Sequence, residues 1–100
     1  LRTLDEAYKI QQLRNYSLNP LASYFWSTMG NAECLGLQHQ IGTIKTGNYA
    51  DLIVLNSKST PLMRHRMEKC KTIGEELFIL QTLGDDRAID SVFIAGKKIK

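Results

Sequence analysis

The residues that decide the fold are 27–55, which read STMGNAECLGL at 27–37, IGTI at 41–44 and GNYADLIVL at 47–55. The first part has the pattern of a short helix that stops at Gly36, where glycine can adopt the left-handed conformation of a helix C-cap. The middle part is rich in turn residues. The last part ends in four apolar residues, 52–55, which are too few for a helix and predict a buried strand.

Helices are predicted on the N-terminal side of this stretch. The apolar residues of 2–14 spread over roughly two-thirds of a helical wheel, so this helix needs neighbours on more than one side. Asn19 is a favoured N-cap, and Pro20 fits the first helical position because its missing N–H would have no partner there. The second helix is predicted to end at Gly30, and a short third helix follows over 31–35.

The C-terminal half alternates helices and strands. A basic helix is predicted over 62–70 after a polar loop. Thr72, with Glu75 three residues later, has the spacing of a capping box, and the apolar helix that follows ends at Gly84. Apolar residues around a Gly96–Lys97 turn predict a hairpin over 91–99. The predicted fold class is therefore α+β, mostly helical.

Composition and charge exclude several classes of protein. No apolar run approaches the ~20 residues that cross a bilayer, and no signal peptide is evident, so we expect a cytoplasmic protein with no membrane partner. The net charge is +3, from 13 basic and 10 acidic residues. The basic residues gather at 64–71 and 97–100 without interleaved aromatics or a reading helix. A solvated basic surface is expected, with no nucleic-acid partner.

Four residues are possible metal ligands: Cys34, His39, His65 and Cys70. Their spacings, C-x4-H and H-x4-C, are longer than those of most structural zinc pairs. On a helix, His65 and Cys70 would lie about 140° apart and diverge. We therefore expect core cysteines, surface histidines and no metal site. A disulfide between the two cysteines is not expected in a cytosolic chain.

The other candidate chemistry is also incomplete. No serine lies in a G-x-S-x-G elbow, and Gly42 and Gly47 lack the G-K-[ST] ending of a phosphate loop. Asp85 and Asp86 are adjacent carboxylates, but consecutive side chains point in different directions. We interpret this aspartate pair as structural, with one carboxylate satisfying turn amides and pairing with Arg87. No catalytic, cofactor-binding or metal residue is predicted in the chain.

The sequence resembles the C-terminal signature of the amidohydrolase superfamily. In that superfamily a T-x-G/N-x-A-x-x-L-G-L helix precedes I-G-x-I-x-x-G-x-x-A-D-L-x-V-L, and 27–55 match both in order and spacing. The stretches TLGDDR at 82–87, VFIAGK at 92–97 and LRTLDEAYK at 1–9 are similar to the guanine deaminase branch. Chlorohydrolases and cytosine deaminases share the middle signature without L-G-D-D-R, and they remain the alternative within the superfamily.

The resemblance implies a (β/α)8 barrel with a small β-sandwich built from both chain termini. It assigns 1–37 to the last barrel helices, 38–56 and 88–100 to sandwich strands, and 57–87 to a helical insertion. The family's zinc ligands, an H-x-H pair, further histidines and an aspartate, would all precede Leu1. The chain is thus expected to be a C-terminal fragment that binds no zinc and is inactive alone. A first residue other than methionine fits this expectation.

The resemblance also implies the activity of the complete protein. A zinc-bound hydroxide would convert guanine and water to xanthine and ammonia, a step of purine catabolism. Helices over 2–14 and 20–29 would lack the strands they pack on, and four uncovered large apolar side chains cost about 6–12 kcal/mol. That rivals the stability of a whole domain, so the isolated chain is expected to repack or self-associate. The resemblance also implies that the complete protein is a homodimer.

A non-enzymatic interaction module is the alternative from another class. Tyr24, Phe25 and Trp26 are three consecutive aromatics that could form a partner-binding surface. We favour the interpretation that they are ordinary core residues.

Overall fold

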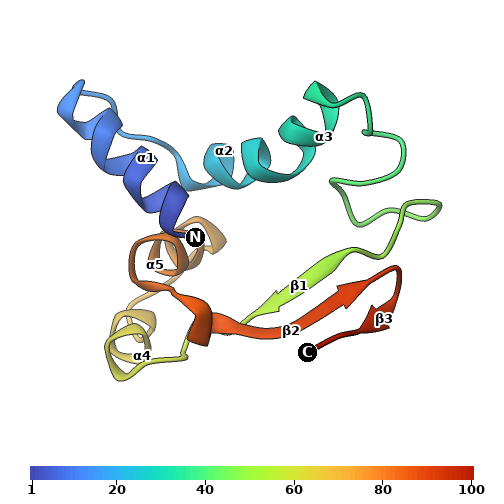
Figure 1. Ribbon diagram of the computed structural model, residues 1–100. Coiled ribbons are helices and arrows are strands. Elements are labelled where there is room, and N and C mark those ends of the chain that lie inside the picture. The colour runs from blue at the N-terminus through green and yellow to red at the C-terminus, as the bar shows by residue number, and fades with distance from the viewer.

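The N-terminal third of the chain is a succession of helical segments along one side of the molecule (Figure 1). The computed structural model describes residues 1–100. In order, the segments are α1 (Arg2–Leu13), α2 (Pro20–Phe25), the π-helical turn η1 (Trp26–Gly30) and α3 (Asn31–Cys34). No helix is both long and apolar enough to cross a membrane.

The predicted start of α2 is confirmed, and its predicted end is wrong. The Asn19 side chain accepts a hydrogen bond from the Leu21 amide at 2.9 Å, and Pro20 occupies the first turn. Gly30 does not stop the helix, since its φ of −59° and ψ of −44° are helical and the chain continues into α3. The Thr28 hydroxyl donates to the Tyr24 carbonyl at 2.7 Å. Such side-chain bonds compete with the backbone ladder, which fits a π-turn here.

The predicted end of α3 is confirmed. Gly36 has a φ of +71°, and the Leu37 amide donates to the Ala32 carbonyl at 2.8 Å. The Gly36 amide also donates to the Glu33 carbonyl at 3.1 Å. These two bonds form a Schellman motif, which needs a residue in the left-handed region and so favours glycine.

The three strands form one antiparallel sheet in the order β1 (Leu52–Leu55), β2 (Ile89–Ile94), β3 (Lys97–Lys98). The predicted hairpin is confirmed with its turn displaced by one residue, since Ala95 and Gly96 carry the positive φ angles of 50° and 80°. The prediction that β1 is buried is wrong. Ile53 is 53% exposed and Val54 is 44% exposed. β1 is an edge strand, and the rest of the chain leaves about half of each of these two residues exposed.

Two helices and a short 3₁₀ turn, η2 (Asp86–Ala88), separate β1 from β2. α4 (Pro61–Met67) begins one residue earlier and ends three residues earlier than predicted. Sequence reasoning missed its cap, the Thr60 hydroxyl, which accepts from the Met63 amide at 3.2 Å. α5 (Ile73–Leu83) has the predicted cap, with the Glu75 amide donating to the Thr72 hydroxyl at 3.2 Å. The Glu75 carboxylate accepts from the Lys71 amide at 2.6 Å, and not from the Thr72 amide as in a complete capping box.

The core is small and centred on α5. Only 10 of the 100 residues are buried, and α1 has none of them. One apolar cluster joins α4, α5 and η2, and its buried members are Met63, Ile79, Leu80 and Ala88. The prediction that the consecutive aromatics are core is wrong for two of the three, since Phe25 is 48% and Trp26 is 53% exposed. The broad apolar surface of the N-terminal helices is therefore largely uncovered within this chain.

Two glycines with similar backbone angles offer a matched test of this packing. A Cβ on Gly42 (φ +99°) would lie 2.8 Å from Ala32 Cβ and 3.0 Å from Met29 Cα, whereas Gly47 (φ +95°) has no atom within 4 Å. We expect Gly47→Ala to lower the free energy of unfolding by about 1–2 kcal/mol, the cost of a left-handed alanine. Gly42→Ala should cost a further ~1–3 kcal/mol through overpacking.

Urea denaturation followed by circular dichroism measures both values. Equal losses for the two variants would contradict the close contact between the loop around Gly42 and α3.

Candidate functional site

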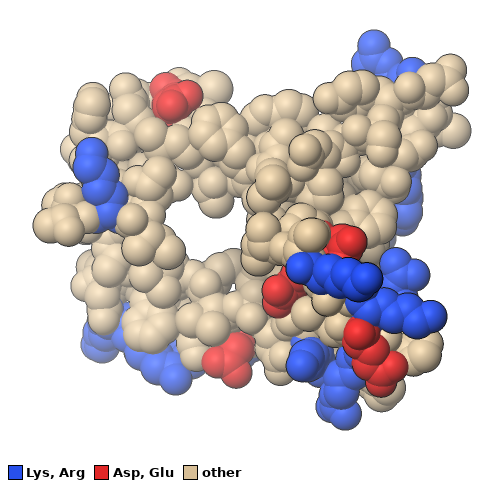
Figure 2. Space-filling model, turned by 180° about the vertical axis from the view of Figure 1, so that it is seen from behind, with Lys and Arg blue, Asp and Glu red and all other residues tan.

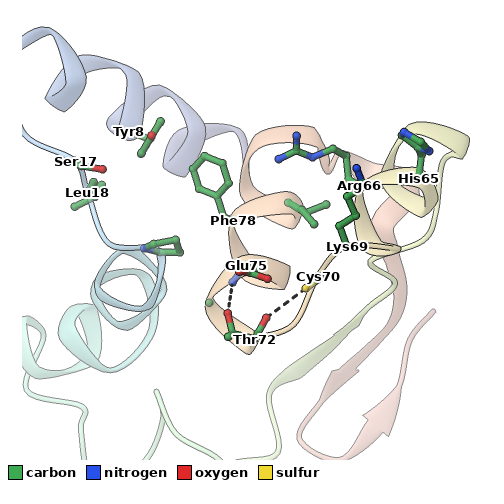
Figure 3. A pocket seen from close by; sticks show the side chains of 13 residues that line it. Tyr8, Ser17, Leu18, His65, Arg66, Lys69, Cys70, Thr72, Glu75 and Phe78 are labelled. Atoms are coloured by element: carbon green, nitrogen blue, oxygen red, sulfur yellow. Dashed lines mark hydrogen bonds between the residues drawn. The ribbon is translucent and has the colours of Figure 1, made fainter.

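One cavity has a polar rim, and we call it the basic pocket (Figure 3). It lies between α1, the link before α2, the C-terminal side of α4 and the first turns of α5, with a volume of about 700 Å³. Its lining residues come from three sequence regions: Tyr8, Ser17, Leu18, Pro20, His65, Arg66, Lys69, Cys70, Thr72, Gly74, Glu75, Phe78 and Ile79. Tertiary packing therefore creates this pocket.

The inner wall of the basic pocket is apolar. Leu18 and Ile79 are buried, with 2% and 4% exposure. The rings of Tyr8 and Phe78 pack edge to face, with centroids 5.0 Å apart and an interplanar angle of 73°. This aromatic pair joins α1 to α5, and it gives the pocket a flat-sided apolar surface.

The outer rim carries cations. Arg66 and Lys69 line the pocket, and neither has a carboxylate oxygen within 4.0 Å. The His65 Nδ1 lies 3.7 Å from a Glu68 carboxylate oxygen, and Figure 3 shows the ring pointing away from the aromatic pair. Glu75 supplies the one carboxylate of the lining, and that group already accepts the Lys71 amide. The rim therefore has more positive than negative charge.

The four possible metal ligands do not come together. No group of three or more His, Cys, Asp and Glu side chains is arranged to hold a metal ion. His65 and Cys70 both line the basic pocket, although their helical spacing predicted divergence, because α4 ends before Cys70. Cys70 donates its thiol to the Thr72 carbonyl at 3.3 Å. Cys34 is exposed, so the prediction of a core cysteine is wrong there, because α3 has no neighbour on that side.

The Asp85–Arg87 pair has the predicted structural geometry. The Arg87 guanidinium donates to the Asp85 carboxylate through Nη2 at 2.7 Å and Nε at 3.1 Å, and the Arg87 amide donates at 2.9 Å. The pKa of the Asp85 carboxyl is held below its usual value, mainly because the Arg87 side chain donates hydrogen bonds to it. The pair fixes the 3₁₀ turn between α5 and β2.

A second and larger cavity, the apolar cleft, lies between η1, α3, the loop 41–51 and the sheet. Its volume is about 930 Å³, and its lining includes Leu35, Ile41, Ile44, Leu52 and Phe93. The space-filling view shows an opening through the molecule (Figure 2). Asp51 also lines this cleft, but its carboxylate accepts from the Ala95 amide at 2.8 Å and so anchors the hairpin turn.

Neither cavity contains a nucleophile with a neighbouring base, or a pair of converging carboxylates. The apolar cleft offers surface for packing. The basic pocket offers an apolar wall beside unpaired cations, which suits binding of an anion better than bond cleavage.

The α2–α5 interface is held by polar contacts that sequence reasoning missed. The Ser23 hydroxyl lies 3.1 Å from the Gln81 side-chain oxygen, and both residues are buried. The Tyr24 hydroxyl donates to the Leu77 carbonyl at 3.2 Å. Burial raises the pKa of Tyr24 to about 12. A serine and a glutamine on helix surfaces carry no sequence signal for this contact, because it depends on how two distant helices pack.

Comparison with known proteins gives consistent matches. A family model described as the amidohydrolase family matches residues 1–99. The chain is 37% identical to guanine deaminase of Escherichia coli (strain K12) over 99 residues, which are 99% of this chain and 23% of that protein. It is 30% identical to guanine deaminase of Homo sapiens over 95 residues, covering 90% of this chain and 20% of that protein. The chain therefore spans less than a quarter of these relatives.

Solved structures match equally well. The structure of E. coli guanine deaminase superposes with a TM-score of 0.95 at 36% identity, covering 99% of this chain and 23% of that one. The crystal structure of guanine deaminase from Bradyrhizobium japonicum gives a TM-score of 0.87 at 23% identity, covering 99% of this chain and 27% of that one. The second match supports the fold alone.

Alkaline pH should weaken the α2–α5 contact. The raised pKa of Tyr24 means that the folded state favours the neutral phenol, so its contribution to stability is complete below pH 10 and is lost as pH rises towards 12. We expect a loss of about 1 kcal/mol in the free energy of unfolding, allowing for solvent screening of a half-exposed ring. Urea denaturation at pH 10 and pH 12 measures this loss.

Tyr24→Phe should abolish most of that pH dependence, and Tyr16→Phe, at an exposed ring, should keep it. A wild-type slope that persists in Tyr24→Phe would refute the assignment.

Proposed function

Because this chain belongs to the amidohydrolase family, we propose that it is the C-terminal scaffold of a guanine deaminase, an enzyme that hydrolyses guanine to xanthine and ammonia. The observation that carries the proposal is the similarity to the E. coli enzyme, which runs over nearly the whole chain in both sequence and structure. Each of the curated relatives described above is a guanine deaminase.

The uncovered apolar surface supports a role as one part of a larger fold. Large exposed side chains occur on α1, on α2, in the loop after α3 and on β1, with Leu13 at 87%, Leu21 at 51%, Ile44 at 92% and Ile53 at 53%. A monomeric domain rarely leaves so much apolar surface in water. In the proposal, this surface packs against the remainder of the enzyme.

In the proposed parent, 1–37 supply the last helices of a (β/α)8 barrel. Residues 38–56 and 88–100 supply strands of an accessory β-sandwich, and 57–87 form a helical insertion. The strand β1 has one unpaired edge, which suits a sheet that continues into another segment. The uncovered apolar surface of the helices supports their assignment to the outside of a barrel.

Catalysis would reside outside these 100 residues. The residues present do not fit a zinc site, since no three possible ligands converge. The proposed zinc would therefore be held by other parts of the parent, and the present chain would keep the barrel closed around it. We place the parent in the cytoplasm, in purine catabolism, as a homodimer. The chain alone should be inactive.

Another amidohydrolase of the chlorohydrolase or cytosine deaminase type is the alternative within the family. A non-enzymatic interaction module is the alternative outside it, and the exposure of Phe25 and Trp26 favours it. Exposure of the same two rings also follows if barrel strands cover them in the parent. A parent that does not turn over guanine would favour the other amidohydrolase, and a soluble monomeric chain would favour the interaction module.

A chimera tests the proposed function. In the E. coli guanine deaminase, the matching 23% of the protein is replaced by this chain. We expect guanine turnover, followed by loss of guanine absorbance, within about tenfold of the E. coli enzyme, a barrier change of about 1.4 kcal/mol. The controls are the E. coli enzyme without this segment and the 100-residue chain alone, both of which should be inactive. A soluble, folded chimera without turnover would refute the scaffold assignment.

Self-association tests the role of the uncovered surface. The isolated chain, with a mass of 11.3 kDa, should sediment as oligomers. Replacing Leu13 and Ile44 with glutamine should shift it towards smaller species, because each burial is worth about 1.5–3 kcal/mol. Analytical ultracentrifugation makes the measurement. A single monomeric species with cooperative unfolding would count against the proposal and in favour of the interaction module.

A further inference from the structure

We propose that the basic pocket is a binding site for a small organic phosphate that carries a flat ring, such as a nucleoside monophosphate. The pocket shares no lining residue with the apolar cleft, which offers surface for packing. The inference therefore stands independently of the deaminase proposal.

Unpaired cations provide the attraction for the phosphate. Arg66 and Lys69 come from the last turn of α4 and the link that follows, three residues apart, and both line the pocket. In Figure 3 both side chains lie on the other side of Phe78 from Ser17 and Leu18. A guanidinium offers a planar fork of donors that matches phosphate oxygens, and an ammonium adds a point charge.

Arg66 differs in this respect from the two other arginines of the C-terminal half, whose side chains have partners. Arg64, two residues earlier on α4, donates its Nε to the Lys58 carbonyl at 3.1 Å, and Arg87 is paired with Asp85. Arg66 has no such partner among the carboxylates of the chain. A guanidinium beside an apolar wall without a partner is available to an anionic ligand.

The start of α5 adds neutral donors to the lining. Thr72 and Gly74 line the pocket, and Gly74 occupies the second helical position, so its amide has no intrahelical partner. A Cβ built on Gly74 would meet only the Thr72 hydroxyl, at 3.9 Å, so the backbone is open to approach. The Glu75 carboxylate opposes an anion, but it is directed to the Lys71 amide at 2.6 Å. Arg66 and Lys69 together carry two positive charges against this one negative charge, so the pocket still favours an anion.

The apolar wall provides the contact for a ring. Tyr8 and Phe78 present an edge-to-face pair next to Leu18 and Pro20. The cavity volume of about 700 Å³ falls within the ~300–1,000 Å³ of small-molecule sites. An inorganic anion would leave this wall in contact with water, whereas a ring joined to the phosphate would cover it.

A bound ligand would contact α1, α4 and α5 together. Because these helices lie in separate parts of the sequence, occupancy would favour the state in which all three are packed. The site would therefore couple the concentration of an organic phosphate to the order of the scaffold.

Calorimetric titration of the active chimera with the E. coli enzyme, in which α1, α4 and α5 are expected to be packed, with adenosine 5′-monophosphate tests the site. Adenosine and inorganic phosphate serve as the two halves of the probe. We expect the monophosphate to bind at least tenfold more tightly than either half. No heat from the monophosphate at millimolar concentration, or adenosine binding equally well, would overturn the proposal.

Matched charge variants separate a site from general attraction. Arg66→Gln with Lys69→Gln should weaken the monophosphate at least tenfold. Arg64→Gln with Lys71→Gln removes the same charge outside the pocket and should change binding less than twofold. Equal losses in the two double variants would mean a diffuse electrostatic effect and would overturn the site. Each single variant, Arg66→Gln or Lys69→Gln, is titrated as well, with far-UV circular dichroism to confirm that helix content is unchanged. If both singles bind like wild type, the proposal fails.

Discussion

The packing around α5 is the constraint on which the other elements depend. α1, α2 and α4 all lie against this helix, each through a different contact: the Tyr8–Phe78 rings, the Ser23–Gln81 and Tyr24–Leu77 polar contacts, and the Met63–Ile79–Leu80 cluster. Truncating a core leucine such as Leu80 to alanine typically costs about 2–5 kcal/mol, which is a large share of the stability of a small domain. The polar contacts hold α2 against α5, because a buried donor or acceptor left without a partner costs free energy.

Local features of the fold could be predicted from the sequence, because they depend on a few neighbouring residues. Asn19–Pro20, the Thr72–Glu75 cap, Gly36 and the β2–β3 hairpin all have short-range physical causes. The π-turn after Phe25 and the exposure of Phe25, Trp26 and β1 could not be predicted in this way. Hydrophobic periodicity indicates which side chains favour burial, and within these 100 residues no surface buries them fully.

The candidate sites also differ in whether they depend on neighbouring residues or on the packing of distant helices. Spacing indicated that the aspartate pair is structural, and the Arg87 fork is the local contact that explains it. The basic pocket could not be predicted, because Tyr8, Arg66 and Phe78 meet only after α1 and α4 pack on α5. From the sequence alone, these cations predict only a solvated basic helix surface, because the aromatic side chains beside them come from distant parts of the chain. In both cavities the chain supplies binding surface and packing surface, which agrees with a scaffold whose chemistry is performed elsewhere.

The central claim is that α5 holds a small core while the remaining elements depend on surface outside this chain. Amide hydrogen exchange, compared between the isolated chain and the chimera with the E. coli enzyme, tests it most directly. The account predicts that α5 and β2 are protected in both. It also predicts that α1, α3 and β1 exchange rapidly in the isolated chain and gain protection of at least a hundredfold in the chimera. Uniform protection of all elements in the isolated chain would contradict the account.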